Sequence, residues 1–436
     1  MITFWPVFAL CLLTFICCKS KNVPMILKYE WANIDYQFLT PDDRVSAISS
    51  GEFVPGNARP IDVDVYYDEY KNQKIFITTP RFTKGIPASL GVITNNALAT
   101  PVLTPYPSWD WYHNPQACKT NRLLSVFRIK IDECGRLWIL DTGSISFVQT
   151  CPPQILAFNL TNNALIHRYE IPSNQIQSNS LLTLPVVDVR DTNSCLGTFV
   201  YVADTRGFGI IVHDVDNKAS WRVSDKTMYA VPDFGTMCVA GSQFELMDGI
   251  QGMALSPYEQ GQDRVLFYHA LASNTEQWVW TSKLRNRTAG SNPNYFHLYC
   301  GRRKTQSSPM AIDKNNIAYF GLAADTSLNC WNAKNSYEGK NIERIYRNTD
   351  TLQYITGLKI ITNKCTDEEE IWLINTRVER IVSGPTNSST TNYRVQKASL
   401  NGFTGCSKIT QPKSYVEYFK DCRRCYNCVV KDQFSI

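Results

Sequence analysis

Histidines and short catalytic motifs are the first residues to test for chemistry in this chain. None of the five histidines stands in a His-Glu-x-x-His pair, and the Gly-x-Ser-x-Gly, P-loop and dinucleotide motifs are also missing. The histidines are His113, His167, His213, His269 and His297. A single histidine of this kind is more often an ordinary strand or surface residue than a ligand. We expect neither a metal ion nor a cofactor, and any site must combine residues that are far apart in sequence.

Polar residues that directly follow predicted strands are the best binding candidates. They are Asp141 and Thr142 after the strand at Trp138, Asp204 after the strand at Tyr201, and Asn375, Thr376 and Arg377 after the strand at Trp372. Each could instead cap a turn. Together with the 12% of aromatic residues, they suit a planar ligand with hydroxyl or amine groups, held by stacking, cation–π contact and a few hydrogen bonds.

Short β-rich runs bounded by Asn, Asp, Gly and Pro dominate the chain and predict a mostly β fold. An aromatic residue in such a run, preceded by a polar turn, recurs six times at intervals of 52 to 66 residues. The six positions are Phe76, Trp138, Tyr201, Phe267, Tyr319 and Trp372. Each unit is long enough for four strands but too small to bury its own faces.

A ring of such units hides every sheet face and leaves only short edges. We therefore predict an all-β, six-bladed β-propeller of four-stranded blades over residues 21–400, with seven blades as the alternative count. A Cys-rich extension, residues 401–436, is expected to strap the first and last blades together. The inner strands converge on a central channel, which is the expected site.

The N-terminus indicates secretion. Ile2 to Cys18 are almost wholly apolar and too short for a membrane span, and no second such stretch follows, so residues 1–20 are expected to be a signal peptide. Its removal leaves twelve cysteines, an even number that favours disulfides. Three glycosylation sequons agree with this route, at Asn159, Asn286 and Asn387. A net charge of +5 gives no reason to expect a nucleic-acid partner.

The last cysteines form a local cluster, Cys422, Cys425 and Cys428, whose two-residue spacings also occur in zinc and iron–sulfur sites. We favour disulfides because no histidine lies nearby and the compartment is oxidising. Bound zinc is the alternative.

Six stretches of this sequence resemble the insect yellow and major royal jelly protein family, in order across roughly residues 25 to 400. They are 118–128, 132–143, 151–154, 201–204, 220–222 and 329–332. The resemblance implies a secreted six-bladed propeller, with Cys134 bonded to Cys195 and Cys300 bonded to Cys330. Similar proteins include pigmentation proteins of melanin formation, dopachrome-converting enzymes, nutritive jelly proteins and salivary proteins that bind biogenic amines.

In the salivary binders, a Thr early in the last blade and a Ser-Asn-Gly-Phe run contact the amine. The resemblance places Thr356 on the first position and Asn375, Thr376, Arg377 and Val378 on the run. Arg377 puts a cation where the binders have Gly, which would repel a protonated amine unless an acid neutralises it. The pigmentation proteins therefore look more similar than the scavengers.

Three hypotheses follow. The first is a secreted protein of melanin or catecholamine metabolism that holds a catechol, indole or amine in the channel. The second is a dopachrome-converting enzyme in which Asp141, Asp204 or a channel histidine supplies acid and base. The third is a salivary amine scavenger. The oligomeric state is not predicted.

Overall fold

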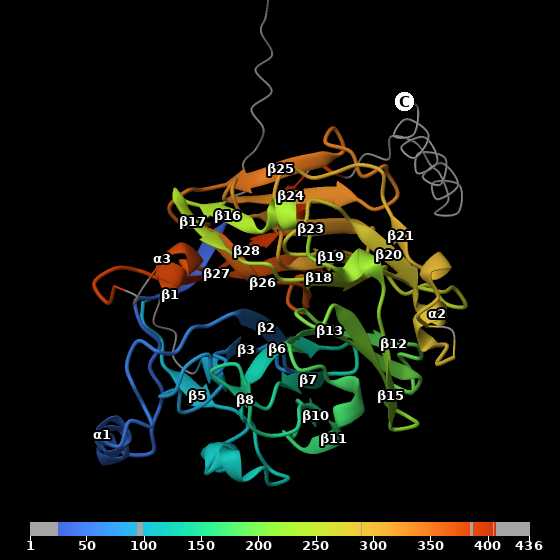
Figure 1. Ribbon diagram of the computed structural model, residues 1–436. Coiled ribbons are helices and arrows are strands. Elements are labelled where there is room, and N and C mark those ends of the chain that lie inside the picture. The colour runs from blue at the N-terminus through green and yellow to red at the C-terminus, as the bar shows by residue number, and fades with distance from the viewer. Residues whose placement is uncertain (1–24, 94–98, 289, 384–386, 404, 407–436) are drawn as a thin grey trace, which may run out of the picture.

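The computed structural model describes residues 25–93, 99–288, 290–383, 387–403 and 405–406. The expected signal peptide and the cluster at Cys422, Cys425 and Cys428 lie outside the described residues. Six antiparallel sheets of four strands each stand around one axis. The chain passes round the ring once, in the colour order from blue to red (Figure 1). The prediction of a six-bladed propeller is confirmed.

The first three blades are numbered in chain order, and each is given from its innermost to its outermost strand. Blade 1 contains β2 (Asp62–Tyr67), β3 (Gln73–Thr78), β4 (Leu90–Ile93) and β5 (Leu103–Pro105). Blade 2 contains β6 (Val126–Ile131), β7 (Arg136–Asp141), β10 (Gln154–Asn159) and β11 (Leu165–Glu170). Blade 3 contains β12 (Leu182–Val189), β13 (Thr198–Asp204), β14 (Gly209–Asp214) and β15 (Ala219–Val223).

The remaining blades follow the same plan, except that the last one takes its outermost strand from the N-terminus. Blade 4 contains β18 (Ile250–Leu255), β19 (Val265–Ala270), β20 (Gln277–Trp280) and β21 (His297–Leu298). Blade 5 contains β22 (Met310–Ile312), β23 (Ile317–Leu322), β24 (Ser327–Asn332) and β25 (Ile342–Arg347). Blade 6 contains β26 (Tyr354–Asn363), β27 (Glu368–Thr376), β28 (Tyr393–Ser399) and β1 (Ile26–Trp31).

All six repeat aromatics lie in the second strand of their blade, one in each of β3, β7, β13, β19, β23 and β27. They are at most 3% exposed, because the faces of neighbouring blades cover them. The six inner strands contact one another in turn, and β26 contacts β2 to complete the ring. The repeat read from sequence is therefore the blade repeat of the structure.

An aspartate in the turn before the second strand fixes where that strand, which carries the repeat aromatic residue, begins. Asp132 accepts hydrogen bonds from the main-chain N–H of Cys134 and Arg136 and from Trp138 Nε1, the last at 2.7 Å. In blade 5 Asp313 accepts from the N–H of Ile317 at 2.8 Å. The carboxylate therefore fixes the tight turn between first and second strands.

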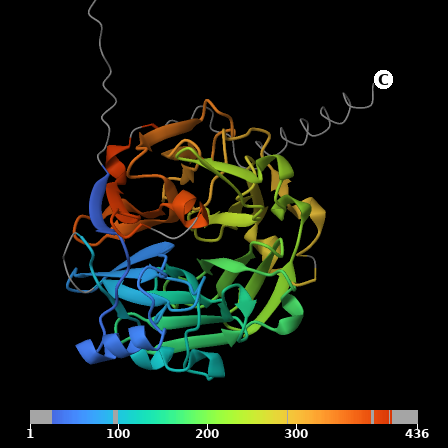
Figure 2. The same ribbon diagram turned by 60° about the vertical axis from the view of Figure 1, so that its left-hand side comes forward.

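The ring is closed by β1, which supplies the outermost strand of the last blade. β1 pairs antiparallel with β28, from Ile26 opposite Lys397 to Trp31 opposite Tyr393. The blue N-terminal strand lies beside the red last blade in Figure 2. Joining the two ends of the propeller within one sheet supplies backbone hydrogen bonds and covers an edge of β28 that would otherwise be exposed. The predicted strap by residues 401–436 stays a prediction. Residues 407–436 lie outside the described residues.

The disulfides correct one implied pairing. Cys134 bonds to Cys195, as the resemblance implies, whereas Cys330 bonds to Cys406 and not to Cys300. Cys330 lies buried in an apolar cluster between blades 5 and 6 that also contains Cys406, while Cys300 is exposed just after β21 of blade 4. A third disulfide joins Cys118 to Cys151.

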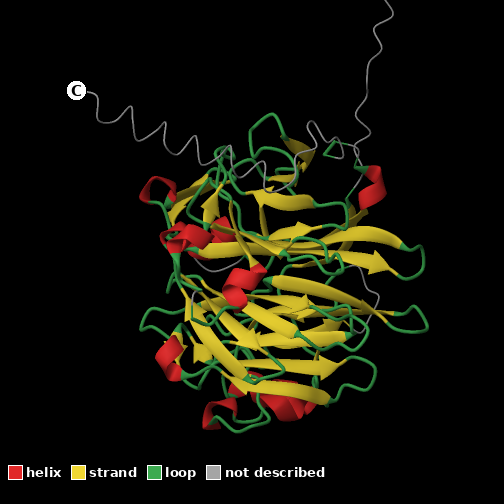
Figure 3. Cartoon of the chain, turned by 90° about the vertical axis from the view of Figure 1, so that its right-hand side faces the viewer, coloured by secondary structure: helices red, strands yellow, loops and turns green. Residues whose placement is uncertain are grey.

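The short helices sit at the surface of the strand body (Figure 3). They are α1 (Pro41–Ser49), α2 (Thr281–Arg285), α3 (Val378–Ser383) and the 3₁₀ turns η1 (Trp109–Tyr112), η2 (Pro115–Ala117), η3 (Ser173–Gln175), η4 (Lys226–Met228), η5 (Pro232–Phe234), η6 (Pro293–Tyr295) and η7 (Leu400–Gly402). Two hairpins add to them, β8 (Ser144–Ile145) with β9 (Val148–Gln149) and β16 (Thr236–Val239) with β17 (Ser242–Glu245). Within the described ranges, every helix is too short or too polar to cross a bilayer.

Candidate functional site

A cavity of about 670 Å³ lies on the ring axis and is lined by the inner strands of all six blades. It extends to the turns that lead from inner to second strands, where exposed Glu133, Lys314 and Lys364 form its rim. Its floor is at the level of Asp62 and Arg128, which are almost fully buried. A pocket of this size accommodates a small aromatic molecule with room to spare.

The inner strands give the cavity one charged half and one apolar half, and the turns beyond the apolar strands add Arg264, Asp313 and Lys314. The adjacent strands β26, β2 and β6 contribute the charged residues, which are Lys359, Asp62, Asp64, Arg128 and Lys130. The opposite strands β12, β18 and β22 contribute apolar residues, which include Leu184, Val186, Met253, Leu255, Met310 and Ile312. An apolar face of a ligand can therefore be buried against the apolar side chains while its polar groups contact the charged ones.

Asp62 and Lys359 form a buried ion pair at the floor. Lys359 Nζ lies 2.8 and 2.7 Å from the two carboxylate oxygens of Asp62, which also accepts from the main-chain N–H of Ile129 at 3.1 Å. That N–H belongs to an inner strand edge with no further strand to pair with, so the carboxylate of the neighbouring blade satisfies it. Both charges are therefore already matched within the protein.

Asp64 lies one step nearer to the rim and has no ion pair within 4.0 Å among the described residues. Its carboxylate accepts from the N–H of Ile131 at 2.8 Å and from its neighbour Val65 at 2.9 Å. Burial raises the pKa of Asp64, and the nearby charges of Lys130 and Lys359 only partly oppose this. A buried carboxyl with a raised pKa at a cavity is a candidate general acid or base.

Arg128 forms the other charged part of the floor. Its Nη2 donates to the carbonyl of Thr356 at 2.9 Å and to Gln251 Oε1 at 3.4 Å. Burial lowers the pKa of its guanidinium from the usual value, and Asp62 is the strongest nearby charge acting against this. Such a side chain is still a cation at neutral pH.

A polar layer beyond Arg128 closes this end of the cavity. Gln251 Nε2 donates to Asp248 at 2.9 Å, Ser308 Oγ donates to Gln251 at 3.2 Å, and Arg206 pairs with Asp248 at 3.2 Å. These contacts connect blade 4 with residues that precede blade 5. The axis therefore has an exposed rim at one end and buried polar contacts at the other.

The comparisons with known proteins agree with this architecture. Residues 124–406 match the family model described as major royal jelly protein. Major royal jelly protein 9 of Apis mellifera is 34% identical over 89% of this chain and 90% of its own length. The chain belongs to the major royal jelly protein family. Other similar proteins are the dopaminechrome tautomerase of Drosophila melanogaster, 30% identical over 90% of this chain and 85% of its own, and protein yellow of Drosophila madeirensis, 31% identical over 86% and 65%.

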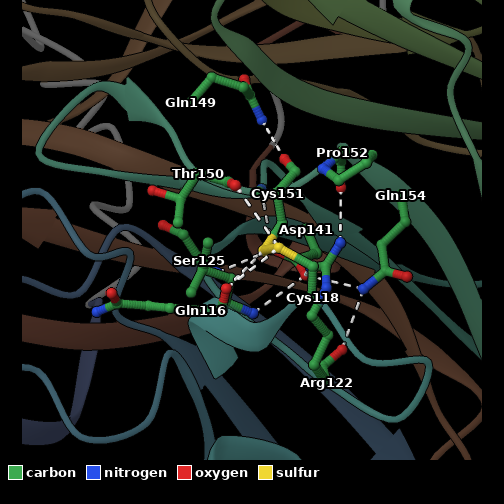
Figure 4. The surroundings of a disulfide bond; sticks show 12 residues. Gln116, Cys118, Arg122, Ser125, Asp141, Gln149, Thr150, Cys151, Pro152 and Gln154 are labelled. Atoms are coloured by element: carbon green, nitrogen blue, oxygen red, sulfur yellow. Dashed lines mark hydrogen bonds and ion pairs between the residues drawn. A yellow bond between two sulfur atoms is a disulfide. The ribbon is translucent and has the colours of Figure 1, made fainter. Parts of the chain in front are cut away.

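In this royal jelly family member, Asp141 lies away from the axial cavity and holds blade 2 together. Its carboxylate pairs with Arg122 at 2.9 Å and accepts from the N–H of Leu124 and Ser125, just before β6 (Figure 4). Gln154 donates to the same carboxylate at 3.0 Å. With so many donors, this side chain fixes where the inner strand begins.

Asp204 has the equivalent place in blade 3. It pairs with Arg222 at 2.8 Å and accepts from the N–H of Leu181, just before β12, at 2.8 Å. Neither Asp204 nor Asp141 lines the cavity, although each ends the second strand of its blade, the position at which the sequence predicts binding residues. The capping alternative describes their contacts well.

The residues that the resemblance implies for amine binding lie at the closed end. The carbonyl of Thr356 accepts from Arg128, and its hydroxyl lies 3.4 Å from the carbonyl of Ile374. Asn375 donates to the carbonyl of Thr351, and Thr376 is 2% exposed. Arg377 pairs with Glu379, so an acid does neutralise it. Their role in binding stays a prediction.

The β16–β17 hairpin contacts α3 at this end, as Figure 1 shows. Met237, Val239 and Phe244 of the hairpin share an apolar cluster with Tyr354, and Val378 packs against it. Hydrocarbon therefore fills the space beside the aligned run. None of the six predicted binding residues lines the axial cavity, which is lined by residues the sequence reasoning missed.

The charged residues that line the cavity, which the sequence analysis did not predict, have a recognisable pattern in the sequence. Asp62 and Asp64 alternate with valines in β2, and Arg128 and Lys130 alternate with apolar residues in β6. Charged side chains inside a largely buried strand need partners, which marks these two strands as unusual. None of the five histidines lines the cavity, and His269 is buried between Glu276 and the carbonyl of Ser308.

Proposed function

We propose that this chain is a secreted protein of melanin or catecholamine metabolism that binds a small catechol, indole or amine in the axial cavity. The observation that carries the proposal is the divided lining, with hydrocarbon on β12, β18 and β22 and charge on β26, β2 and β6. Three disulfides fit an oxidising, extracellular compartment. The names of two relatives, protein yellow and dopaminechrome tautomerase, favour pigment chemistry.

Calorimetric titration with dopa, dopamine, 5,6-dihydroxyindole and serotonin tests the proposal, and we expect saturable heat from at least one of them. Ile312→Trp should weaken that binding by about tenfold or more, because the added ring competes for the cavity. Leu196→Trp is the matched control, since Leu196 is 59% exposed and does not line the cavity. Absence of heat with every compound, or equal binding by both variants, would contradict the proposal.

A second candidate is a tautomerase of aminochromes, favoured by buried Asp64 and by the name of one relative. In such a reaction Asp64 would accept a proton from a ring carbon, and an acid would return one to a quinone oxygen. Lys130 also lines the charged half of the cavity and would be the acid that gives a proton to the quinone oxygen. The proton moves from carbon to oxygen, so no oxidant is needed.

The loss of aminochrome colour tests this activity against a heat-treated control. Asp64→Asn keeps the size of the side chain and removes the base, so we expect the rate to fall by about 10²-fold or more. Asp110→Asn, the same change at an exposed site outside the cavity, should leave the rate nearly unchanged. A protein that does not accelerate the reaction at all is a binder and not this enzyme.

A further inference from the structure

Arg128 is a buried cation that forms no direct ion pair with a carboxylate of the described residues, although Asp62 and Asp248 act on it from farther away. It is 4% exposed, and no carboxylate oxygen of the described residues lies within 4.0 Å of its guanidinium nitrogens. Its acceptors are neutral: the carbonyl of Thr356, the amide oxygen of Gln251 and, at 3.5 Å, the carbonyl of Thr183. Its Nε is buried with no hydrogen-bond partner.

Other buried arginines of the described chain are satisfied differently. Arg122 and Arg264 pair with aspartates at 2.9 and 3.1 Å. Arg81 also lacks a carboxylate, but its guanidinium donates to four main-chain carbonyls, those of Ile86, Pro87, Leu123 and Leu124. Arg128 has fewer and longer contacts and, unlike Arg81, lines the axial cavity. An incompletely satisfied guanidinium at the floor of a cavity is suited to an anionic group from a ligand.

The charges around Arg128 also favour an anion. Lys359 is matched by Asp62, which leaves Arg128 and Lys130 against the single carboxyl of Asp64. The charged residues of β26, β2 and β6 are therefore net positive even when both aspartates are ionised, and the other carboxylates of the lining, Asp132, Glu133, Asp313 and Glu369, lie in or beside the turns at the rim. This field disfavours an ammonium group at the floor and favours a carboxylate.

The apolar wall of the cavity indicates which group the ligand has besides its anionic group. The wall of β12, β18 and β22 faces the charged strands with aliphatic and thioether side chains, against which a planar ring can lose its water. We propose that the axial cavity selects aromatic ligands that carry a carboxylate, and that Arg128 binds this carboxylate at the floor. This inference rests on the proposed binding function and narrows it from catechols, indoles and amines in general to their acids.

Matched ligand pairs test the inference on the full chain. Dopa against dopamine, and tryptophan against tryptamine, differ by one carboxylate, and 3,4-dihydroxyphenylpropionate has the acid without the amine. We expect each acid to bind about tenfold or more tighter than its decarboxylated partner, as for a charge-assisted hydrogen bond. Arg128→Gln should remove this preference, and Arg128→Lys should keep part of it. Arg347→Gln, half-exposed and outside the cavity, is the control.

The outcomes separate the two proposals. Binding of aromatics without any preference for the acids, or a preference that survives Arg128→Gln, would overturn this inference and leave the binding function standing. Binding of no aromatic compound would overturn both. If Arg128→Gln fails to fold, as circular dichroism would reveal, the wild-type ligand pairs and Arg128→Lys still decide: acids must bind more tightly, and less so in the variant.

Discussion

A pair of histidines between blades 2 and 3, His213 buried and His167 half-buried, is expected to make stability depend on pH. His213 Nδ1 donates to the carbonyl of Ala219, which leaves its Nε2 to accept from His167 Nε2–H at 2.9 Å. Burial lowers the pKa of each imidazole to about 4, and in His167 the nearby cations Lys218 and Arg136 add to this. The pair is thus neutral in the folded protein, with Tyr169 stacked on His213.

A lowered folded-state pKa means that the unfolded chain binds more protons, so stability falls as pH decreases from about 6.5 to about 4. For buried His213 alone the loss at pH 4.5 is about 2 to 3 kcal/mol. Thermal unfolding at pH 7 and pH 4.5 measures it. His213→Gln should lose less stability over this range than the wild type, whereas His113→Gln, at an exposed site, should follow the wild type. Equal losses in all three proteins would show that the pair does not control the pH response.

The sequence predicts that polar residues line an axial cavity, but it does not predict which polar residues these are. The sequence predicts Asp141 and Asp204 as binding residues because they follow predicted strands. At the same position, each accepts a hydrogen bond from a main-chain N–H just before the inner strand of its blade. Asp62 and Arg128 were missed because a charge inside an apolar run has no local partner in sequence. Their partners come from other blades: Lys359 lies 297 residues from Asp62. Such pairs become visible only when the ring closes.

At the level of elements, the blade was predictable and its fastening was not. The spaced aromatics identify the second strand of every blade because each must be buried between two sheets. β1 has no such marker, and its pairing with β28 joins residues more than 350 positions apart. The β16–β17 hairpin and α3 are also additions to the repeat, and they decide which end of the axis is filled. Because these insertions are not part of the repeat, the spacing of the aromatic residues does not predict them.

For the whole molecule, the ring gives the protein two unlike ends. One end has charged, exposed rim residues around a cavity, and the other is closed by polar contacts and by hydrocarbon from the hairpin. A ligand can therefore enter from the rim and meet Arg128 last. The residues that the resemblance to amine-binding proteins implies lie at the closed end, whereas the cavity is lined by the inner strands.

A crystal structure of the protein with bound dopa tests this account most directly. We predict that the ring lies against β12, β18 and β22 in the axial cavity and that the carboxylate lies within hydrogen-bond distance of Arg128. Dopa bound beneath the β16–β17 hairpin, beside Thr356 and Thr376 and with the axial cavity unoccupied, would contradict it.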